Sequence, residues 1–422
     1  MDRIHINGGN RLKGKIKISG SKNSALPILA ATLLTDKSIK LNNVPNLSDV
    51  SSMINLLESL NVIVSKKKKN SYEVRATQPK SLYASYELVR KMRASFLILG
   101  PLLTKYGSAK VSLPGGCAIG TRPVDIHLEN LEKMGAEFSI KDGYVEGKVK
   151  KKLFGTTLNF RKKSVGATEN IIMAATLAEG KTTIINAAME PEITDLCNFL
   201  NKIGAKIKGQ GTEKVEIIGV DELLGCSYSV MPDRIEVGTF ALCVLGCGGQ
   251  VTLTNINNEI YSHLNDIFKP IKLLKIKKMN ESEILVKKNK HNSLNLKITT
   301  QEYPGFPTDL QAQLTSALLK SNGISEINEK IFENRFMHIS ELKRMGANVK
   351  KKGSMVKIVG VKKIYGAELM ATDLRASSSL IIAGLMAEGK TIINRVYHLD
   401  RGYENIEKKL RYCGAKIKRV KK

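Results

Sequence analysis

The sequence predicts an α/β protein of two similar domains, each built from three repeat units. Three observations support this fold class. The chain has 422 residues, of which 42% are hydrophobic and 25% are charged, and this is enough material for the cores of two or three domains. A pattern of helix, turn, strand, helix and strand recurs along the chain. A Gly-Ala pair marks this recurrence at a near-constant spacing.

The Gly-Ala pairs end an amphipathic helix in each clear copy of the repeat. They begin at Gly135, Gly204, Gly346 and Gly414. Their separations are 69, 142 and 68 residues, so the middle gap spans two periods. Degenerate copies at 56–64 (LLESLNVIV) and 270–279 (PIKLLKIKKM) complete a series of six units. A period of about 70 residues is long for a solenoid repeat, so two groups of three units fit the length better.

The first half of each unit reads as a helix, a tight turn and a strand. It is clearest in ILAATLLTDKSIKLNNV from Ile28, IIMAATLAEGKTTIINA from Ile171 and LIIAGLMAEGKTIINRV from Leu380. Small apolar residues suit close helix packing, a glycine suits the helix C-cap, and Thr-Ile-Ile favours a strand. Residues 384–391 (GLMAEGKT) also spell a phosphate-binding loop. A true loop of that kind follows a strand and opens a helix, and the order is reversed here, so we expect no ATP binding.

The charge of the chain points to an anionic partner. Lys and Arg number 67 against 39 Asp and Glu, which gives a net charge of +28. The basic runs at 66–69, 150–152, 161–163 and 418–422 are scattered, and most of them read as solvated lysine faces. None of these runs is interleaved with aromatic residues, as a single-strand binding surface would be, and the chain has 5% aromatic residues and no tryptophan. Nucleic-acid binding is therefore disfavoured, and the charge alone does not distinguish a membrane surface from a small phosphorylated substrate.

Composition also bears on location and on cofactors. The mean hydropathy is −0.14, and no run of about 18 apolar residues suggests a membrane-spanning helix. Residues 1–10 (MDRIHINGGN) lack the apolar segment of a secretory signal, so we expect a cytoplasmic protein. The six cysteines contain no C-x-x-C pair, and we expect neither disulfides nor a metal site nor a bound cofactor.

Two segments carry residues with a reactive or anion-binding character. Lys22 follows the strand-like KIKISG and precedes the first apolar helix, where it either holds a phosphate near the helix N-terminus or is an ordinary solvated lysine. Cys117 lies in the glycine-rich loop 114–123, five positions before Arg122. The positive charge would lower the pKa of the thiol and increase its reactivity. The alternative is a plain turn with an incidental cysteine.

A carboxylate and several arginines stand in distinctive contexts. Asp309 ends the turn YPGFPTD before the helix-like LQAQLTSALL, and it is either a helix cap or a base that takes a proton from a hydroxyl nucleophile. Arg93, Arg335, Arg375 and Arg401 lie in RKMRAS, ENRFMH, TDLRAS and HLDRGYE. Arginine suits carboxylate and phosphate recognition, although each arginine alone is weak evidence.

An ordered series of motifs along the whole chain resembles the enolpyruvyl transferases. The series comprises SKNSALPILAA, MRASFLILGPLL, PGGCAIGTRPVDIHL, KSVGATENIIMAATLAEG, PDRIEVGTF, FPTDLQAQ, ENRFMH, DLRASSSL and HLDRGYENI. The resemblance implies two inside-out α/β barrel domains, residues 22–231 and residues 1–21 with 232–422. It also implies an active site in the cleft between the domains.

The resemblance further implies a reaction. The 3-hydroxyl of UDP-N-acetylglucosamine adds to C2 of phosphoenolpyruvate, and the intermediate loses phosphate, as the first committed step of peptidoglycan synthesis. Cys117 matches the family's proton donor to C3, which fosfomycin alkylates. Lys22, Arg122 and Arg401 match phosphate and carboxylate binders. Asp309 matches the carboxylate that contacts the sugar hydroxyl and is the favoured base. A low pKa among several cations would make it a weak base and mainly an orienting group.

The binding residues carry over position by position from the family's motifs. For phosphoenolpyruvate they are Lys22, Asn23, Arg122, Arg375 and Arg401. For the nucleotide sugar they are Arg93, Arg122, Pro123, Val124, Asp125, Ile126, Lys162, Ser164, Val165, Gly166, Asp309 and Ile331. The expected partners are these two small molecules, with neither nucleic acid nor a membrane, and the oligomeric state stays open.

Three alternatives remain. The first is a sister transferase acting on shikimate 3-phosphate, against which the cysteine loop and RPVDIHL argue. The second is a basic nucleic-acid-binding repeat protein, motivated by the net charge of +28. The third is a catalytically idle relative that acts as a regulator, although every catalytic-looking position is filled.

Overall fold

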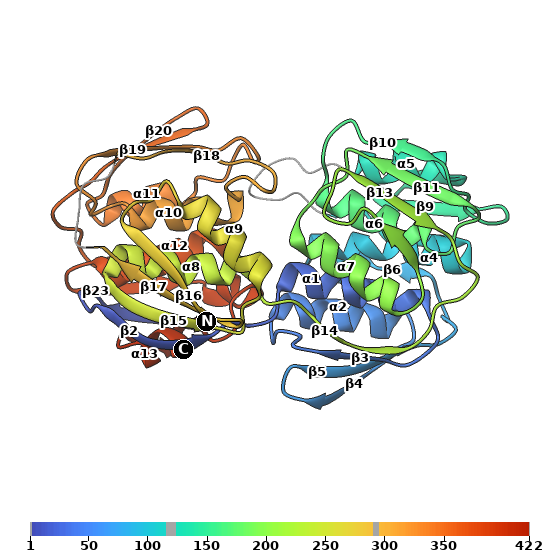
Figure 1. The fold of residues 1–422 in the computed structure, drawn as a ribbon, viewed down its shortest axis with the longest axis horizontal. Helices are drawn as coiled ribbons and strands as arrows, with labels where there is room; N and C mark the ends of the chain where they lie inside the picture. The colour runs from blue at the N-terminus through green and yellow to red at the C-terminus, as the bar shows by residue number, and fades with distance from the viewer. Residues whose placement is uncertain (1, 115–123, 290–294, 422) are drawn as a thin grey trace. The chain divides into compact units, whose positions relative to one another are not determined.

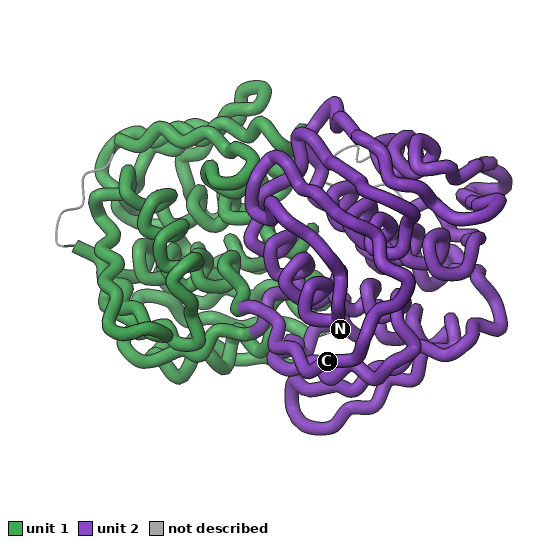
Figure 2. Tube along the Cα trace, turned by 45° about the vertical axis from the view of Figure 1, so that its right-hand side comes forward, with its two compact units in different colours: residues 1–19, 117–121, 232–422 green, residues 20–116, 122–231 purple. Residues whose placement is uncertain are grey.

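The computed structural model describes residues 2–114, 124–289 and 295–421. Apart from the residues that it does not describe, the chain falls into two compact units. Of the described residues, unit 1 contains 2–19, 232–289 and 295–421, and unit 2 contains 20–114 and 124–231 (Figure 2). None of the helices in the described ranges is both long and apolar enough to cross a membrane.

Each unit is built from three four-stranded sheets with one topology. In every sheet the first and second strands pair in parallel, the second and third pair antiparallel, and the third and fourth pair antiparallel. The sheets of unit 2 are β14 (Cys226–Ser229), β3 (Ile39–Asn42), β5 (Ser71–Ala76), β4 (Val62–Lys68); β6 (Tyr83–Ala84), β7 (Ser108–Ser112), β9 (Tyr144–Val149), β8 (Ala136–Lys141); and β10 (Thr157–Asn159), β11 (Lys181–Ile185), β13 (Lys214–Ile218), β12 (Lys206–Lys208). Those of unit 1 are β2 (Leu12–Lys17), β15 (Gly249–Thr254), β17 (Glu283–Lys288), β16 (Leu274–Asn280); β18 (Lys297–Thr299), β19 (Ile324–Asn328), β21 (Met355–Val359), β20 (Asn348–Lys352); and β22 (Glu368–Met370), β23 (Lys390–Asn394), β1 (Arg3–Asn7), β24 (Lys416–Val420).

The small-residue helices lie inside each unit, and the sheets lie around them. In unit 1 these are α8 (Arg234–Cys247), α10 (Gln311–Ala317) and α12 (Leu374–Met386), which pack against one another and are almost wholly buried (Figure 1). In unit 2 they are α1 (Lys22–Ala31), α4 (Leu99–Tyr106) and α6 (Val165–Ala175). A helix surrounded by sheet must be apolar on all sides, which explains the alanine-rich and isoleucine-rich runs. The predicted α/β class with two similar three-repeat units is confirmed.

A second set of helices completes the repeats. These are α2 (Ser48–Ser59), α5 (Asp125–Lys133), α7 (Pro191–Lys202), α9 (Asn258–Phe268), α11 (His338–Arg344) and α13 (Ile406–Tyr412). The short helix α3 (Tyr86–Val89) and the 3₁₀ turns η1 (Thr32–Leu34), η2 (Arg93–Ile98), η3 (Thr308–Leu310) and η4 (Val396–Arg401) lie between repeat elements. Helices such as α2 and α9 are buried on one face only, as their amphipathic sequences require, whereas α7 is buried except along the narrow stripe of Thr194, Asn198, Asn201 and Lys202.

The Gly-Ala anchors have the backbone geometry that the repeat demands. Gly135, Gly204, Gly346 and Gly414 have φ angles of 98°, 105°, 84° and 89°. In the degenerate first copy Asn61 takes this position with φ 65°. A left-handed residue after the helix turns the chain into the next strand, and glycine and asparagine adopt that conformation at least cost.

The chain returns on itself to complete two sheets of unit 1 and one of unit 2. The N-terminal strand β1 lies between β23 and β24, with Ile4 opposite Ile393 and Arg419. Strand β2 pairs in parallel with β15, and β14 closes the first sheet of unit 2 beside β3. The N-terminal segment therefore belongs to unit 1, with β1 in its last sheet and β2 in its first.

Candidate active site

The first turns of the internal helices carry many of the predicted site residues. Lys22 is the first residue of α1, and Arg93 opens η2 before α4. Ser164 caps α6. In unit 1, Asp309 lies in η3 before α10, and Arg375 lies in the first turn of α12. Helix N-termini present unpaired N–H groups and favour anions, so the repeat places anion-binding positions at equivalent points.

In unit 1, Asp309 is held between two arginines. Its Oδ1 lies 2.7 Å from Arg335 Nη2, and its Oδ2 lies 2.5 Å from Arg375 Nη2. The arginine side chains are each 7% exposed, whereas the aspartate side chain is 24% exposed. Asp373 fixes the start of α12 by accepting hydrogen bonds from the N–H groups of Arg375 and Ala376 at 2.8 and 3.0 Å. Asp309 is therefore a partly exposed carboxylate held by two buried arginines, Arg335 and Arg375.

The electrostatics keep Asp309 ionised. Burial raises the pKa of its carboxyl, but the charges and hydrogen bonds of Arg375 and Arg335 outweigh burial and hold that pKa well below its usual range. Burial lowers the pKa of Arg375 and the adjacent Asp309 outweighs it, so the net shift is upward. Asp309 is thus a permanent hydrogen-bond acceptor and a weak base.

Ile331 is connected by a chain of hydrogen bonds to Arg335, one of the two arginines that hold Asp309. Its N–H donates to Glu329 Oε1 at 2.8 Å, and Glu329 Oε2 accepts from the hydroxyl of Thr308 at 2.8 Å. That hydroxyl accepts in turn from Arg335 Nη1 at 3.0 Å. The half-buried Ile331 is therefore fixed through Glu329 and Thr308 to the arginine that holds Asp309.

Arg401 is the last residue of η4. This turn packs against α12, the helix that contains Arg375. The Arg401 side chain is half-buried. The preceding Asp400 pairs with Arg419 of β24 at 2.5 Å. This ion pair fixes the backbone of η4 immediately before Arg401.

In unit 2, Lys22 is paired with a carboxylate. Its Nζ lies 2.9 Å from Asp49 Oδ2 of α2, and the two side chains are 13% and 4% exposed. Ser21 caps α1, and its hydroxyl accepts from the N–H of Ser24 at 3.3 Å. The expected position of Lys22 beside a helix N-terminus is confirmed, and Asn23 follows it in the first turn.

A second group of predicted residues meets at the N-termini of α5 and α6. Val124 precedes α5, and Asp125 in its first turn is paired with Arg161, which reaches Glu129 as well at 3.3 Å. Ser164 caps α6 by accepting from the N–H of Ala167 at 3.3 Å. The structure thus brings the segment 124–126 to the segment 161–166. Within that second segment Lys162 and Val165 are exposed.

His127 packs beneath this helix start. A Cβ atom at Gly166 would lie 3.3 Å from the His127 ring, so glycine permits the close packing. Burial, and next the charge of Arg93, lowers the pKa of His127 to about 3. Its Nδ1 faces Asn170 Nδ2 at 3.1 Å, so the neutral ring accepts a hydrogen bond there.

Three predicted residues, Cys117, Arg122 and Pro123, lie outside the described residues. Their assignments stay predictions. Sequence reasoning singled out Arg335 by its motif without placing it in the site, and it missed Asp49 altogether. The signal for Asp49 was weak, because NLSDV reads as an ordinary helix start.

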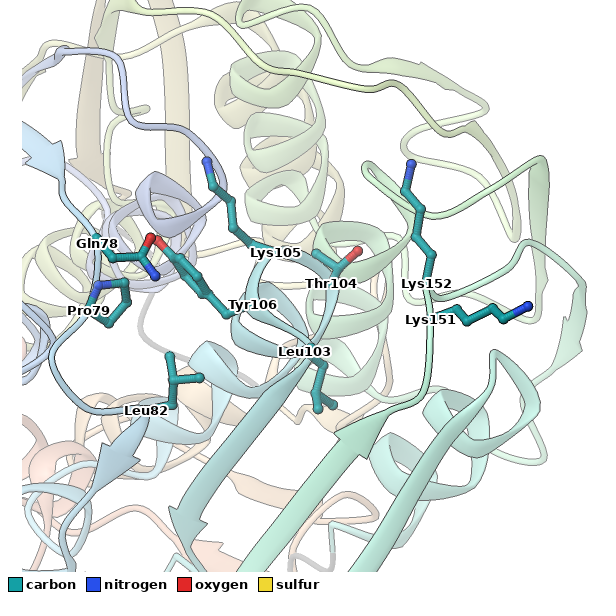
Figure 3. A pocket seen from close by; sticks show the side chains of 10 residues that line it. Gln78, Pro79, Leu82, Leu103, Thr104, Lys105, Tyr106, Lys151 and Lys152 are labelled. Atoms are coloured by element: carbon teal, nitrogen blue, oxygen red, sulfur yellow. The ribbon is translucent and has the colours of Figure 1, made fainter.

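A pocket of about 480 Å³ in unit 2 contains none of the predicted residues (Figure 3). It is lined by Gln78, Pro79, Leu82, Leu103, Thr104, Lys105, Tyr106, Gly107, Lys151 and Lys152. The Lys105 ammonium donates to the Leu34 carbonyl at 3.0 Å, and Lys152 lies 3.7 Å from Asp221. We therefore do not assign the site to this pocket. Among the described residues, no group of three or more His, Cys, Asp or Glu side chains could hold a metal ion.

Comparisons with known proteins agree along the whole chain. Residues 6–410 match the family described as EPSP synthase (3-phosphoshikimate 1-carboxyvinyltransferase). The chain is 53% identical over 421 residues to the UDP-N-acetylglucosamine 1-carboxyvinyltransferase of Pelagibacter ubique, with 100% of both chains covered. It is 48% identical to the protein of the same name from Coxiella burnetii, covering 100% of this chain and 96% of the relative.

Solved structures share the fold at lower identity. The enolpyruvyl transferase NikO from Streptomyces tendae has a TM-score of 0.88 at 22% identity, with 99% of each chain covered. EPSP synthase from Acinetobacter baumannii has a TM-score of 0.76 at 16% identity, with 100% of each chain covered. At these identities the likeness bears on the fold alone.

Proposed function

The chain belongs to the EPSP synthase (3-phosphoshikimate 1-carboxyvinyltransferase) family and is a transferase, and we propose that it transfers the enolpyruvyl group of phosphoenolpyruvate to the 3-hydroxyl of UDP-N-acetylglucosamine. The observation that carries the choice of acceptor is the 53% identity over the full length to a relative named for that sugar nucleotide. Likeness to the solved EPSP synthase is limited to 16% identity. Transfer to shikimate 3-phosphate is thus the less supported alternative.

The proposed reaction proceeds by addition and elimination. The acceptor oxygen bonds to C2 of phosphoenolpyruvate and gives up its proton, while C3 gains a proton. The bond between C2 and the phosphate oxygen then breaks, and C3 loses a proton, which restores the double bond and releases phosphate. The reaction therefore needs a proton donor at C3, cations for the phosphate and carboxylate, and an acceptor for the hydroxyl hydrogen.

Asp309 is assigned to the sugar hydroxyl. Its carboxylate accepts hydrogen bonds, and its side chain is 24% exposed, so one face can meet a substrate. Because Arg335 and Arg375 hold its pKa low, it orients the 3-hydroxyl more than it removes the proton. Ile331, fixed through Glu329, lines the same position.

Cations at helix starts are assigned to phosphoenolpyruvate. Lys22 binds the phosphate or carboxylate with Asn23 beside it, and their place at the start of α1 favours an anion. Arg375 and Arg401 are assigned to the same substrate. Arg122 completes this set, and Cys117 delivers the proton to C3; both assignments rest on the sequence motif alone.

The nucleotide sugar is assigned mainly to unit 2. The proposed contacts are Arg93, Arg122, Pro123, Val124, Asp125, Ile126, Lys162, Ser164, Val165 and Gly166. The start of α6 suits a phosphate group, because the first N–H groups of a helix have no acceptor within the helix and favour an anion. Domain limits of 22–231 and of 1–21 with 232–422 belong to this proposal.

This activity would supply the first committed intermediate of peptidoglycan in a bacterial cytoplasm. Loss of the protein would then affect cell shape and division. Fosfomycin would alkylate Cys117.

The test measures phosphate release from phosphoenolpyruvate with UDP-N-acetylglucosamine or shikimate 3-phosphate as the acceptor. Release that depends on the nucleotide sugar, and that Cys117→Ser reduces, is the expected result. Release only with shikimate 3-phosphate would assign the chain to the sister activity. Absence of release with both would overturn the proposal and favour a regulatory or nucleic-acid-binding role.

A further inference from the structure

The hydroxyl of Tyr403 lies where the three internal helices of unit 1 meet. Tyr403 follows η4, is 2% exposed and is among the largest fully buried side chains of the described residues. Helices α8, α10 and α12 each place a polar side chain against its hydroxyl. A polar group buried this deeply is tolerated only when its hydrogen bonds are made.

The hydrogen-bonding capacity of this hydroxyl is fully used. It accepts from Arg375 Nη1 at 3.3 Å and from Gln313 Nε2 at 3.2 Å, and both of these are N–H donors. Its own hydrogen faces the hydroxyls of Thr239 at 2.8 Å and Ser378 at 3.3 Å. Those two hydroxyls donate elsewhere, to the carbonyls of Ile235 and Arg375, so each can accept from Tyr403.

Two of the partners of the Tyr403 hydroxyl, Arg375 and Gln313, also bind Asp309. Arg375 uses its other terminal nitrogen, Nη2, to hold Asp309 Oδ2 at 2.5 Å. Gln313 Nε2 also donates to the backbone carbonyl of Asp309 at 2.7 Å. The guanidinium of Arg375 lies 5.8 Å from the centre of the Tyr403 ring. Tyr403 therefore contacts two of the residues that hold Asp309, namely Arg375 and Gln313.

We propose that Tyr403 is a positioning residue that fixes the Arg375 guanidinium and, through Gln313, the backbone at Asp309. This inference rests on the proposed function, in which Asp309 orients the acceptor hydroxyl. Without the phenol oxygen, Nη1 of Arg375 and the amide of Gln313 each lose an acceptor in a buried place. The guanidinium then turns toward other acceptors, and the geometry at Asp309 loosens.

The test compares Tyr403→Phe with Tyr228→Phe. Tyr228 in unit 2 donates its hydroxyl hydrogen to Asp195 Oδ1 at 2.6 Å, so the control removes the same atom and also breaks a bond to an ionisable side chain. Tyr403→Phe should lower kcat about ten-fold, with a loss of Tm similar to that of the control. The KM for UDP-N-acetylglucosamine should change less than about three-fold, since most proposed contacts to it lie in unit 2. The control should keep its kcat.

A double-mutant cycle with Arg375→Lys tests whether Tyr403 acts through that arginine. If it does, the two losses of kcat combine to much less than their product. A kcat for Tyr403→Phe within two-fold of wild type, an equal loss in the control, or fully multiplicative losses would each overturn the inference. If Tyr403→Phe does not fold, Thr239→Val withdraws one acceptor of the same hydroxyl, and an unchanged kcat in that variant would also overturn it.

A crystal structure of Tyr403→Phe separates this inference from the proposed function. A turned Arg375 guanidinium is expected, and an unmoved one would refute the positioning role whatever the enzyme's substrate. If the wild-type protein releases no phosphate with UDP-N-acetylglucosamine, the proposed function fails instead.

Discussion

The Lys22 ammonium lies 2.9 Å from the Asp49 carboxylate, and both side chains are nearly buried at the start of the first internal helix of unit 2. The cation that we propose for phosphoenolpyruvate binding is thus held in place by a carboxylate on the neighbouring helix α2. The carboxylate fixes the position of the ammonium and offsets the cost of keeping its charge out of water.

Asp49→Asn should destabilise the protein, because it leaves the Lys22 charge without this carboxylate in a poorly solvated place. The expected loss is about 2 kcal/mol of unfolding free energy, toward the lower end for a broken buried pair because Lys22 is 13% exposed. Urea denaturation measures it. Glu283→Gln is the control, because Glu283 pairs with the exposed Lys15 at 2.5 Å, and it should cost less than about 1 kcal/mol. Equal losses in the two variants would contradict the prediction.

Asp309→Asn should abolish most activity and also reduce stability. The neutral amide removes the carboxylate that pairs with two buried guanidinium groups and offers the acceptor hydroxyl a weaker partner. We expect kcat to fall at least about 100-fold and unfolding free energy to fall by about 3 kcal/mol. Steady-state phosphate release and urea denaturation measure the two effects. Retention of more than a tenth of wild-type kcat would argue against the assigned role of Asp309.

His263→Phe should make the stability of the protein less sensitive to acid. Burial, and next the charge of Arg234, lowers the pKa of His263 in the folded protein to about 3, against 6.5 as its ordinary value. The unfolded chain therefore binds the extra proton first. The stability contributed by the neutral ring is complete above about pH 6.5 and is lost as the pH falls toward 3.

The replacement suits the site, since the ring packs 4.7 Å from Tyr303 and its Nε2 has no hydrogen-bond partner among the described residues. Between pH 6 and 4 the slope of unfolding free energy against pH should drop by about 1.4 kcal/mol per unit. Denaturation at several pH values measures this slope. An unchanged slope would show that His263 does not titrate as described.

Fosfomycin should add to Cys117 once per chain, and Cys117→Asp should abolish the addition. The described cysteines are poor competitors, because burial raises the pKa of Cys197 and of Cys247 to about 12 and that of Cys413 to about 11. A thiol reacts as its thiolate. Intact-protein mass spectrometry measures the addition, and a second adduct or labelling of the variant would go against this assignment.

Local chemistry made much of the fold predictable. The Gly-Ala anchors were readable because a left-handed turn after a helix demands a residue such as Gly204, and the copy with Asn61 shows the same demand met differently. The reversed order in GLMAEGKT is likewise local: Gly384 lies inside α12 and Thr391 in β23. These features depend on neighbouring residues only.

The site was less predictable because its contacts join distant residues. Asp309 meets Arg375 across 66 positions, and Tyr403 meets Thr239 across 164. A single sequence contains no sign of such pairs, although motifs marked Asp309, Arg335 and Arg375 one by one. Tyr403 carried no signal of its own, since a buried tyrosine in RGYE reads as an ordinary core residue.

The pairing of β1 with β23 and β24 constrains the order in which the two units can fold during translation. The ribosome makes residues 3–7 before their neighbours at 390–394 and 416–420, so strand β1 stays unpaired until those segments emerge. Unit 2 has all its strands once β14 at 226–229 has left the exit tunnel, and it can close first. Unit 1 cannot close until the final strand is released.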